Sequence, residues 1–354
     1  MKKAIIYGVL NWGLGHATRS IPIIRSLIRL DFEIIICSDE DALILLKKEF
    51  PLLTFVTLPG YNVKYKYRSM VLNMMRYCIG MLKAIHREEK ILNELVHKYH
   101  PSFIISDNRY GLHHKNVKSI FMTHQLNIPS RKKWQSITAN KFLHQFIKHF
   151  DVCWVPDLEG KPNLSGLLSH NASVSIPVHY VGPLSRFEYV DIAPKYDVAF
   201  VLSGPEPQRT MLENIIIDQQ SKLKGKCCLV RGTNVEMSGP SKTNSNLDVF
   251  DLVETKVLQK LIAESRLLVC RSGYTSIMDL VAMQKTAILI PTPGQPEQEY
   301  LAKHLSTQFP NFSFMEQNKF DISEIEVANK NWDGAISIPV WEDANLAHLL
   351  ELDA

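Results

Sequence analysis

Residues 266–305 limit what this chain can fold into more than any other stretch, because short apolar runs alternate there with turns rich in glycine and proline. The apolar runs at 266–270 and 286–290 have the length of buried strands. Between them, apolar residues recur at helical spacing, at Ile277, Leu280 and Val281. This order of strand, turn and helix, repeated, predicts a parallel sheet with both turns at the carboxyl ends of strands, where α/β folds bind ligands.

The turn after the first of these runs has the chemistry of an anion site. It consists of Arg271, Ser272, Gly273, Tyr274 and Thr275. The turn opens a helix, whose N–H groups and dipole attract an anion, and Gly273 lets the backbone approach a phosphate closely. Asp279 follows one helical turn later, and a carboxylate accepts hydrogen bonds from both hydroxyls of a ribose. We expect a nucleotide here; the alternative is an ordinary βαβ unit with a solvated turn.

On these residues, the stretch resembles the donor-nucleotide half of GT-B glycosyltransferases, most closely family 28, which includes the peptidoglycan lipid N-acetylglucosaminyltransferases. The resemblance implies that Asp279 binds the ribose, at a position where those relatives carry Glu. It also implies that Gln298 contacts the donor sugar, while Glu299 replaces a second Gln and Gln295 lies nearby. The expected fold class is α/β, with two doubly wound, Rossmann-like domains facing an interdomain cleft.

A second turn in the same half agrees with this resemblance. The apolar run at 196–202 predicts a strand, and a helix is expected from about residue 208. Between them, Ser203 and Gly204 lie where GT-B enzymes contact the diphosphate. We expect Arg209, in the first helical turn, to add a cation for this anion.

The first turn of the chain joins a predicted strand at 3–10 to an amphipathic helix. The dinucleotide fingerprint G-x-G-x-x-G is weak there, because Thr18 stands in place of its third glycine, although Asp39 lies where a ribose-binding acid is found. The GT-B family instead has a glycine-rich turn ending in His, which Gly13, Gly15 and His16 match. His16 is the candidate general base, because an imidazole titrates near neutral pH. The alternative is that His16 only hydrogen-bonds the turn.

Two further strand ends are candidates for the acceptor site. Predicted strands at 103–106 and 119–122 are followed by Asp107 and by His124 and Gln125. In a parallel sheet these turns open on the same edge as His16. His124 has the alternative of a structural histidine, and no set of residues has a metal-ligand spacing.

Residues 61–90 differ in composition from the rest of the first half of the chain. Tyrosines alternate with lysine and arginine, and a methionine-rich run follows at roughly helical period. Such a segment suits a lipid surface or an apolar acceptor. The alternative is a core helix preceded by a loop.

Residues 1–185 contain 24 Lys and Arg against 13 Asp and Glu, a net charge of +11, which favours an anionic partner or membrane surface.

The domain boundary is expected in the Gly- and Pro-containing stretch at 180–186. We expect an acceptor-binding domain at 1–185, a nucleotide-sugar donor domain at 186–330, and a helical segment at 331–354 that returns to the first domain.

The six cysteines form no C-x-x-C pair and lie mostly in apolar runs, and no apolar run approaches the roughly 20 residues of a membrane span. A cytoplasmic protein is predicted, with peripheral contact to the inner membrane face through residues 61–90.

The predicted function is transfer of a hexosyl group from a UDP-sugar to a hydroxyl of a carbohydrate or lipid-linked acceptor of the cell envelope. The expected mechanism is a metal-independent inverting displacement without a cofactor, in which helix N-termini hold the leaving diphosphate. No nucleic-acid partner is expected. A UDP-sugar 2-epimerase of the same fold and a non-catalytic nucleotide-sugar binder are the alternatives.

Overall fold

The computed structural model describes residues 2–61, 70–129, 133–234, 245–325, 338–339, 341 and 343–350. By its internal contacts the chain forms two compact units. The N-terminal unit comprises Met1–Glu159, Leu167–Arg186 and Trp341–Ala354, and the C-terminal unit comprises Gly160–Gly166 and Phe187–Val340.

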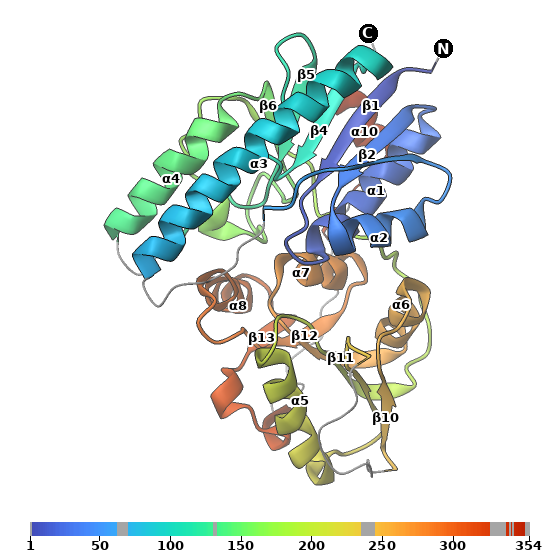
Figure 1. The fold of residues 1–354 in the computed structure, drawn as a ribbon. Coiled ribbons are helices and arrows are strands. Elements are labelled where there is room, and N and C mark those ends of the chain that lie inside the picture. The colour runs from blue at the N-terminus through green and yellow to red at the C-terminus, as the bar shows by residue number, and fades with distance from the viewer. Residues whose placement is uncertain are drawn as a thin grey trace. The chain divides into compact units, whose positions relative to one another are not determined.

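The N-terminal unit is built on a seven-stranded sheet in which every ladder is parallel (Figure 1). Its strands lie in the order β3-β2-β1-β4-β5-β6-β7. Their bounds are β1 Ala4–Val9, β2 Glu33–Ser38, β3 Thr54–Thr57, β4 Phe103–Asp107, β5 Lys118–Met122, β6 Val152–Val155 and β7 Val178–Tyr180. All six residues of β1 are buried, as expected of a central strand covered on both faces.

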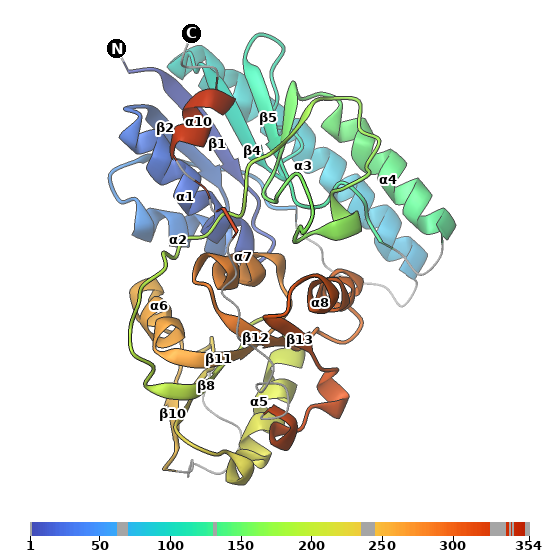
Figure 2. The ribbon, with the colours of Figure 1, turned by 180° about the vertical axis from the view of Figure 1, so that it is seen from behind.

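Helices cover both faces of this sheet. They are α1 Gly15–Arg29, α2 Glu40–Glu49, α3 Met70–Tyr99, α4 Lys133–Ile147 and α10 Asp343–Leu349. Helices α3 and α4 lie on one face (Figure 1), and α1, α2 and α10 lie on the other (Figure 2). On the first face, Leu92 and Leu95 of α3 pack with Ile6 and Ile104, and Leu143 of α4 packs with Phe121.

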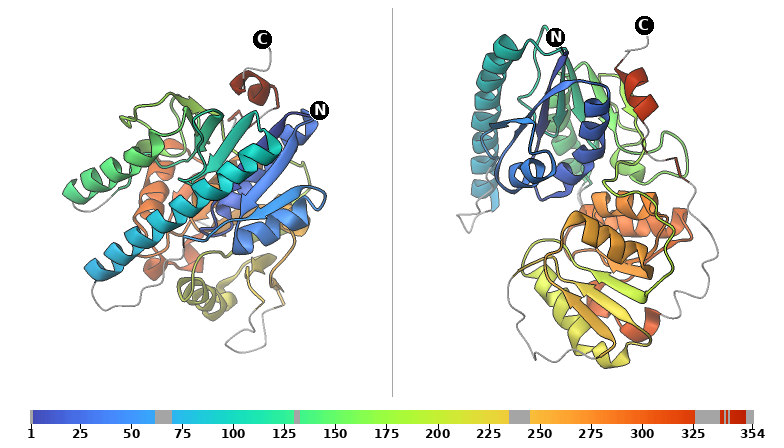
Figure 3. Two further views of the ribbon diagram at one scale, coloured as in Figure 1. Left: turned by 45° about the horizontal axis from the view of Figure 1, so that its top comes forward. Right: turned by 90° about the vertical axis from the view of Figure 1, so that its right-hand side faces the viewer.

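The C-terminal unit has a six-stranded parallel sheet in the order β10-β9-β8-β11-β12-β13. The strands are β8 Tyr196–Val201, β9 Cys227–Val230, β10 Leu247–Phe250, β11 Ser265–Cys270, β12 Thr286–Leu289 and β13 Phe312–Phe314. The helices are α5 Gln208–Asp218, α6 Thr255–Ala263, α7 Tyr274–Ala282 and α8 Pro296–Gln308. Helix α5 lies on one face and α6 and α7 lie on the other (Figure 3). The alternation predicted for residues 266–305 is therefore confirmed as β11, α7, β12 and α8.

Each sheet reverses its strand order beside its first strand. Strand β1 lies between β2 and β4, and β8 lies between β9 and β11. At such a point the connections leave to opposite faces, so the turns at the carboxyl ends separate and leave room for a ligand. The expected α/β class with two doubly wound units is thus present, and the turns after β1, β4, β8 and β11 lie at these points of reversal.

The two units are not continuous in the sequence, and their bounds differ from the expected boundaries at 185 and 330. Residues 160–166 belong to the C-terminal unit, although the chain on both sides of them belongs to the N-terminal unit. His304 Nε2 lies 2.9 Å from the carbonyl oxygen of Asn163, and Gly166 packs against Tyr300 and His304. Gly166 has φ +52°, and a Cβ there would stand 2.2 Å from the Tyr300 hydroxyl, so this contact requires glycine.

The end of the chain packs on helix α1. Trp341 Nε1 donates a hydrogen bond of 2.9 Å to Ser26 Oγ, and the Leu346 side chain of α10 is fully buried. Because α1 carries His16, this contact supports the helix on which the candidate base lies.

We predict that Leu346→Ala lowers the free energy of unfolding by about 2–5 kcal/mol, because it leaves a cavity where a buried leucine packed. Chemical denaturation measures the change. His348→Ala is the matched control, because His348 lies exposed on the same helix and its loss is expected to cost less than about 0.5 kcal/mol. Equal stabilities of the two variants would show that α10 does not pack as described.

Candidate functional site

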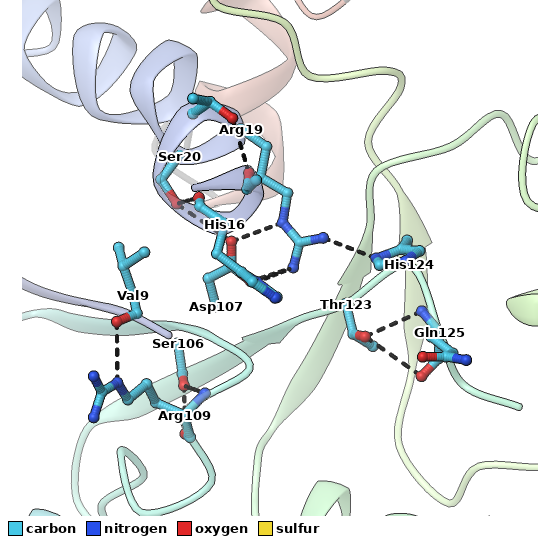
Figure 4. Close-up of polar contacts among 12 residues, drawn as sticks. Val9, His16, Arg19, Ser20, Ser106, Asp107, Arg109, Thr123, His124 and Gln125 are labelled. Carbon is cyan, nitrogen blue, oxygen red and sulfur yellow. Dashed lines mark hydrogen bonds and ion pairs between the residues drawn. The ribbon is translucent and has the colours of Figure 1, made fainter. Parts of the chain in front are cut away.

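Polar residues gather at the carboxyl edge of the N-terminal sheet (Figure 4). Val9 pairs with Asp107, and Asp107 pairs with Met122, so β1, β4 and β5 end level with one another. The turn after β1 uses Gly13 at φ +76°, and α1 then begins at Gly15, which places His16 in the first helical turn. His124 follows two residues after the end of β5. The sheet geometry therefore brings together His16, Asp107 and His124, as their positions after strand ends predicted.

His16 and Asp107 form a close pair. His16 Nδ1 lies 2.7 Å from Asp107 Oδ1; the histidine side chain is 12% exposed and the aspartate is fully buried. Burial raises the pKa of Asp107, but the Arg19 guanidinium and His16 outweigh it, and the pKa is about 2. The carboxylate is therefore ionised and only accepts hydrogen bonds, so His16 Nδ1 carries the proton and Nε2 keeps its lone pair.

Arg19 is the member of this group that the sequence reasoning missed. It is 1% exposed, and its Nε donates to Asp107 Oδ2 at 2.7 Å while Nη2 donates to Oδ1. Its Nη1 lies 2.8 Å from Nδ1 of His124, and Nη2 lies 2.9 Å from Nδ1 of His16. The available signal was its spacing, because a residue three positions after His16 lies on the same helix face.

The side chain of Gln125 makes none of the described contacts with these groups. Its backbone N–H donates to Thr123 Oγ1 at 3.1 Å, and Thr123 Oγ1 donates back to its carbonyl at 3.4 Å. The backbone of Gln125 therefore shapes the turn after β5. Its substrate role stays a prediction that rests on its position after this strand.

A second buried group lies behind the first and accounts for Asp39. Arg109, fully buried, donates to Asp39 Oδ1, to Glu88 Oε1 at 2.8 Å and to the Val9 carbonyl at 3.0 Å. Tyr61 adds a hydrogen bond of 2.7 Å to Glu88 Oε2. Because its carboxylate holds Arg109, Asp39 is a structural residue, and the dinucleotide interpretation of the first turn loses its ribose-binding acid.

In the C-terminal unit, the turn after β8 exposes Ser203 and Gly204, and Gly204 has φ +100°. Arg209 does not join them. Arg209 is 5% exposed. Its guanidinium donates to Glu206 Oε1 at 2.6 Å, to Glu213 Oε2 and to the Arg231 carbonyl at 3.3 Å. The expectation of a cation directed at the diphosphate is corrected accordingly, because two carboxylates of the same helix region already balance its charge.

The turn after β11 is tied to the turns on either side of it. Arg271, 1% exposed, donates to the carbonyls of Ile290 at 3.2 Å and Gln208 at 2.7 Å. No carboxylate among the described residues contacts this guanidinium, and its Nε is buried without a hydrogen-bond partner. Burial lowers the pKa of Arg271 to about 10, so the side chain remains a cation at neutral pH.

Helix α7 begins after Gly273, whose lack of a side chain leaves its N-terminus without a side-chain cap. Tyr274, in the first turn, is buried, and Thr275 is partly buried beside it. Asp279 lies half-buried one turn further along the helix. These positions keep an uncapped helix N-terminus and a carboxylate on one short helix, as the sequence predicted.

Gln298, Glu299 and Gln295 lie at the start of α8. Ser272 Oγ donates to the Gln298 carbonyl at 2.8 Å, which joins this helix to the turn after β11. The Gln298 side chain accepts from the Thr292 backbone at 2.9 Å, and Glu299 accepts from the Gly294 backbone at 2.9 Å. Gln295 is the exposed N-cap residue. The first two side chains therefore also shape the turn that precedes them.

Of the segment at 61–90, residues 62–69 lie outside the described residues, and the side chains of 70–79 are not described. Tyr61 lies before α3, and residues 70–90 belong to α3, where Leu82 is 48% exposed. Within the described residues, no helix is both long and apolar enough to cross a membrane. The same part of the chain contains no group of three or more His, Cys, Asp or Glu side chains that could hold a metal ion.

Comparison with known families divides the chain in two. Residues 199–326 match the glycosyltransferase family 28 C-terminal domain. Residues 3–128 match a glycosyl transferase family 1 profile. No curated protein matches the chain in sequence.

Several solved glycosyltransferases share the fold of the whole chain. The glycotransferase of kitacinnamycin is 13% identical with a TM-score of 0.67, over 99% of this chain and 95% of the other. The spinosyn rhamnosyltransferase SpnG, solved with thymidine diphosphate, is 12% identical with a TM-score of 0.63, over 99% and 100%. MurG of Acinetobacter baumannii is 11% identical with a TM-score of 0.59, over 99% of each chain. Together with the two family matches, these structures identify the chain as a GT-B glycosyltransferase of the family-28-like type.

Proposed function

We propose that this glycosyltransferase moves a hexosyl group from a UDP-sugar to a hydroxyl of a carbohydrate or lipid-linked acceptor, by an inverting displacement. The observation that carries the proposal is the His16–Asp107 pair, in which an ionised, buried carboxylate holds the proton of the imidazole on Nδ1. His16, whose side chain is 12% exposed, then has a basic nitrogen at Nε2.

In the proposed step, His16 Nε2 takes the proton of the acceptor hydroxyl as its oxygen bonds to the anomeric carbon and the bond to the diphosphate breaks. Asp107 is a positioning residue in this step. It keeps Nε2 unprotonated before the reaction and stabilises the imidazolium that forms, because a buried carboxylate 2.7 Å away interacts strongly with that charge. A single displacement from the face opposite the leaving group inverts the anomeric centre.

The turns at the carboxyl ends of β8 and β11 support a donor that carries a diphosphate. The N-terminus of α7 has no side-chain cap, and Gly204 allows close approach of the backbone in the turn after β8. Arg271 begins the turn after β11, and its guanidinium has backbone carbonyls and no described carboxylate for partners. A buried cation without an anion is costly, so a bound diphosphate has a favourable role to fill. We assign leaving-group stabilisation to these groups, and the proposed displacement does not require a metal ion.

The surface of the N-terminal unit supports the proposed acceptor class. Its share of the sequence is strongly basic, and helix α4 exposes Trp134 at 64% and Ile137 at 48%. Exposed apolar groups on a unit with a basic sequence suit an acceptor with a lipid chain and an anionic linkage, at the membrane surface of the cell envelope. A cytoplasmic enzyme with peripheral membrane contact is consistent with this acceptor.

For the donor, we predict that Asp279→Asn weakens UDP and UDP-hexose alike by roughly 10- to 150-fold, because one hydrogen bond to a charged group is lost at the ribose. Gln298→Ala is expected to weaken the UDP-hexose and leave UDP unchanged. Isothermal titration calorimetry measures both, with Gln308→Ala, an exposed glutamine on the same helix, as the matched control. Thymidine diphosphate and NAD are titrated beside UDP, and tighter binding of either one than of UDP would contradict the proposed donor.

For catalysis, we predict that His16→Ala lowers the transfer rate by roughly 10²- to 10⁴-fold, the range for losing a general base, while UDP affinity is retained. His86→Ala is the matched control, because that histidine is 67% exposed on α3. Product analysis of radiolabelled UDP-hexose with and without acceptor provides the measurement. An epimerised UDP-sugar formed without acceptor would indicate the isomerase alternative, and full activity of His16→Ala would remove the residue from the role.

The pH dependence of kcat/KM gives a separate test. Burial lowers the pKa of His16, Arg19 lowers it further, and Asp107 opposes both. The base is active when neutral, so the rate falls as the pH drops through its pKa, and we expect that midpoint below about 6.5, the value of an unperturbed histidine. An acid limb centred above this value would contradict the assignment.

A further inference from the structure

Arg19 contacts side chains from three elements of the N-terminal unit, and its chemistry restricts where their protons lie. Its Nε and Nη2 hold Asp107 of β4, and its Nη1 lies 2.8 Å from Nδ1 of His124 (Figure 4). A guanidinium has five N–H groups and no lone pair, so it donates and never accepts. Each nitrogen or oxygen that bonds it must therefore offer a lone pair.

For His124, this condition fixes the form of the ring. If Nδ1 accepts from Arg19, it has no proton, and the neutral imidazole carries its proton on Nε2. A doubly protonated His124 would place an N–H against an N–H beside a buried cation. The residue is 9% exposed, so water has little access to relieve that repulsion.

For His16, the neighbouring carboxylate fixes the opposite form. Asp107 Oδ1 is the closer partner of His16 Nδ1, at 2.7 Å. Arg19 Nη2 lies 2.9 Å from the same nitrogen, but Nη2 also donates to Asp107 Oδ1, so its contact with a protonated Nδ1 is a close approach and not a hydrogen bond. The negative oxygen favours a proton on Nδ1, and the cation disfavours a second proton on the ring. Among the described residues, His124 and, from β1, the buried hydroxyl of Tyr7 beside Asp107 are further titratable groups that act on this pair, and the Ser20 hydroxyl donates to Asp107 Oδ2 at 3.3 Å.

We propose that Arg19 is a positioning residue that fixes the protons of the two histidines in opposite places, on Nδ1 in His16 and on Nε2 in His124. Its importance for catalysis rests on the proposed function, in which His16 is the general base. The arrangement of protons itself does not rest on that function.

Nitrogen NMR of selectively labelled histidine side chains tests the arrangement directly in the full chain, because the two neutral tautomers and the imidazolium have distinct nitrogen shifts. His16→Gln and His124→Gln assign the signals. At pH 7 the wild type is expected to show His16 protonated on Nδ1 and His124 protonated on Nε2. His124 protonated on Nδ1, or on both nitrogens, would overturn the proposal.

Two variants separate the charge of Arg19 from its shape. Arg19→Gln removes the cation, so the His16 titration is expected to move to higher pH and the Nε2 preference of His124 to be lost. Arg19→Lys keeps the charge in one ammonium that cannot bond Asp107 and His124 in the same fork, so His16 titrates near the wild-type pH while His124 becomes a mixture. Arg25→Gln, on the same helix and paired with Glu49, is the control and leaves both histidines unchanged.

Unchanged signals in Arg19→Gln would overturn the proposal, and if that variant does not fold, the wild-type tautomers and Arg19→Lys decide it. In transfer assays we expect Arg19→Gln to lose about 10- to 100-fold in kcat, less than His16→Ala at its upper range. The acid limb of its rate profile is expected to move to higher pH, together with the NMR titration. If the tautomers are as expected but no sugar transfer occurs in the wild type, the proposed function fails and the role of Arg19 stands.

Discussion

A buried guanidinium needs compensation, and the compensation of three buried arginines organises the turns of this protein. Arg19, Arg109 and Arg271 are among its largest fully buried side chains. Arg19 is balanced by Asp107 and Arg109 by Asp39, with Glu88, whose pKa burial raises to about 8, as a further hydrogen-bond partner of Arg109. Arg271 has backbone carbonyls in place of a carboxylate. Removing one member of such a pair leaves the other charge uncompensated, so each arginine fixes the ends of the strands and helices around it.

The three arginines differ in what they leave for a ligand. Arg109 is fully engaged with its own unit, where it joins the ends of β1, β2 and β4 to helix α3. Arg19 is balanced in charge but sets the hydrogen-bonding state of two imidazoles. Arg271 retains its positive charge within the turn after β11. The first supports the fold, the second tunes a reactive group and the third provides potential for an anion.

The sequence predicted the fold where a local pattern was sufficient. The apolar runs that became β11 and β12 alternate with turn residues, and such runs specify buried parallel strands without knowledge of their neighbours. The meeting of His16, Asp107 and His124 also followed from sequence, because each comes after a strand and parallel strands share an edge. The rest depended on which partner each side chain takes. Arg209 occupies the expected place in its helix, and Glu213 four residues later is at a spacing that permits a pair, but only the side-chain geometry shows that the pair forms. The spacing of Arg19 places it on the helix face of His16, but its carboxylate partner Asp107 lies 88 residues away in the sequence, and only the folded structure shows that contact.

Because each unit is made of segments that are not continuous in the sequence, the chain cannot be cut once to give two complete units. A fragment that stops after residue 185 would lack the final helix that covers α1, and it would retain residues 160–166, whose partners Tyr300 and His304 lie in the other fragment. A fragment that starts at residue 186 would have the converse defects. Fragments of this enzyme that are meant to fold separately should therefore keep residues 160–166 with the C-terminal unit and the final helix with the N-terminal unit.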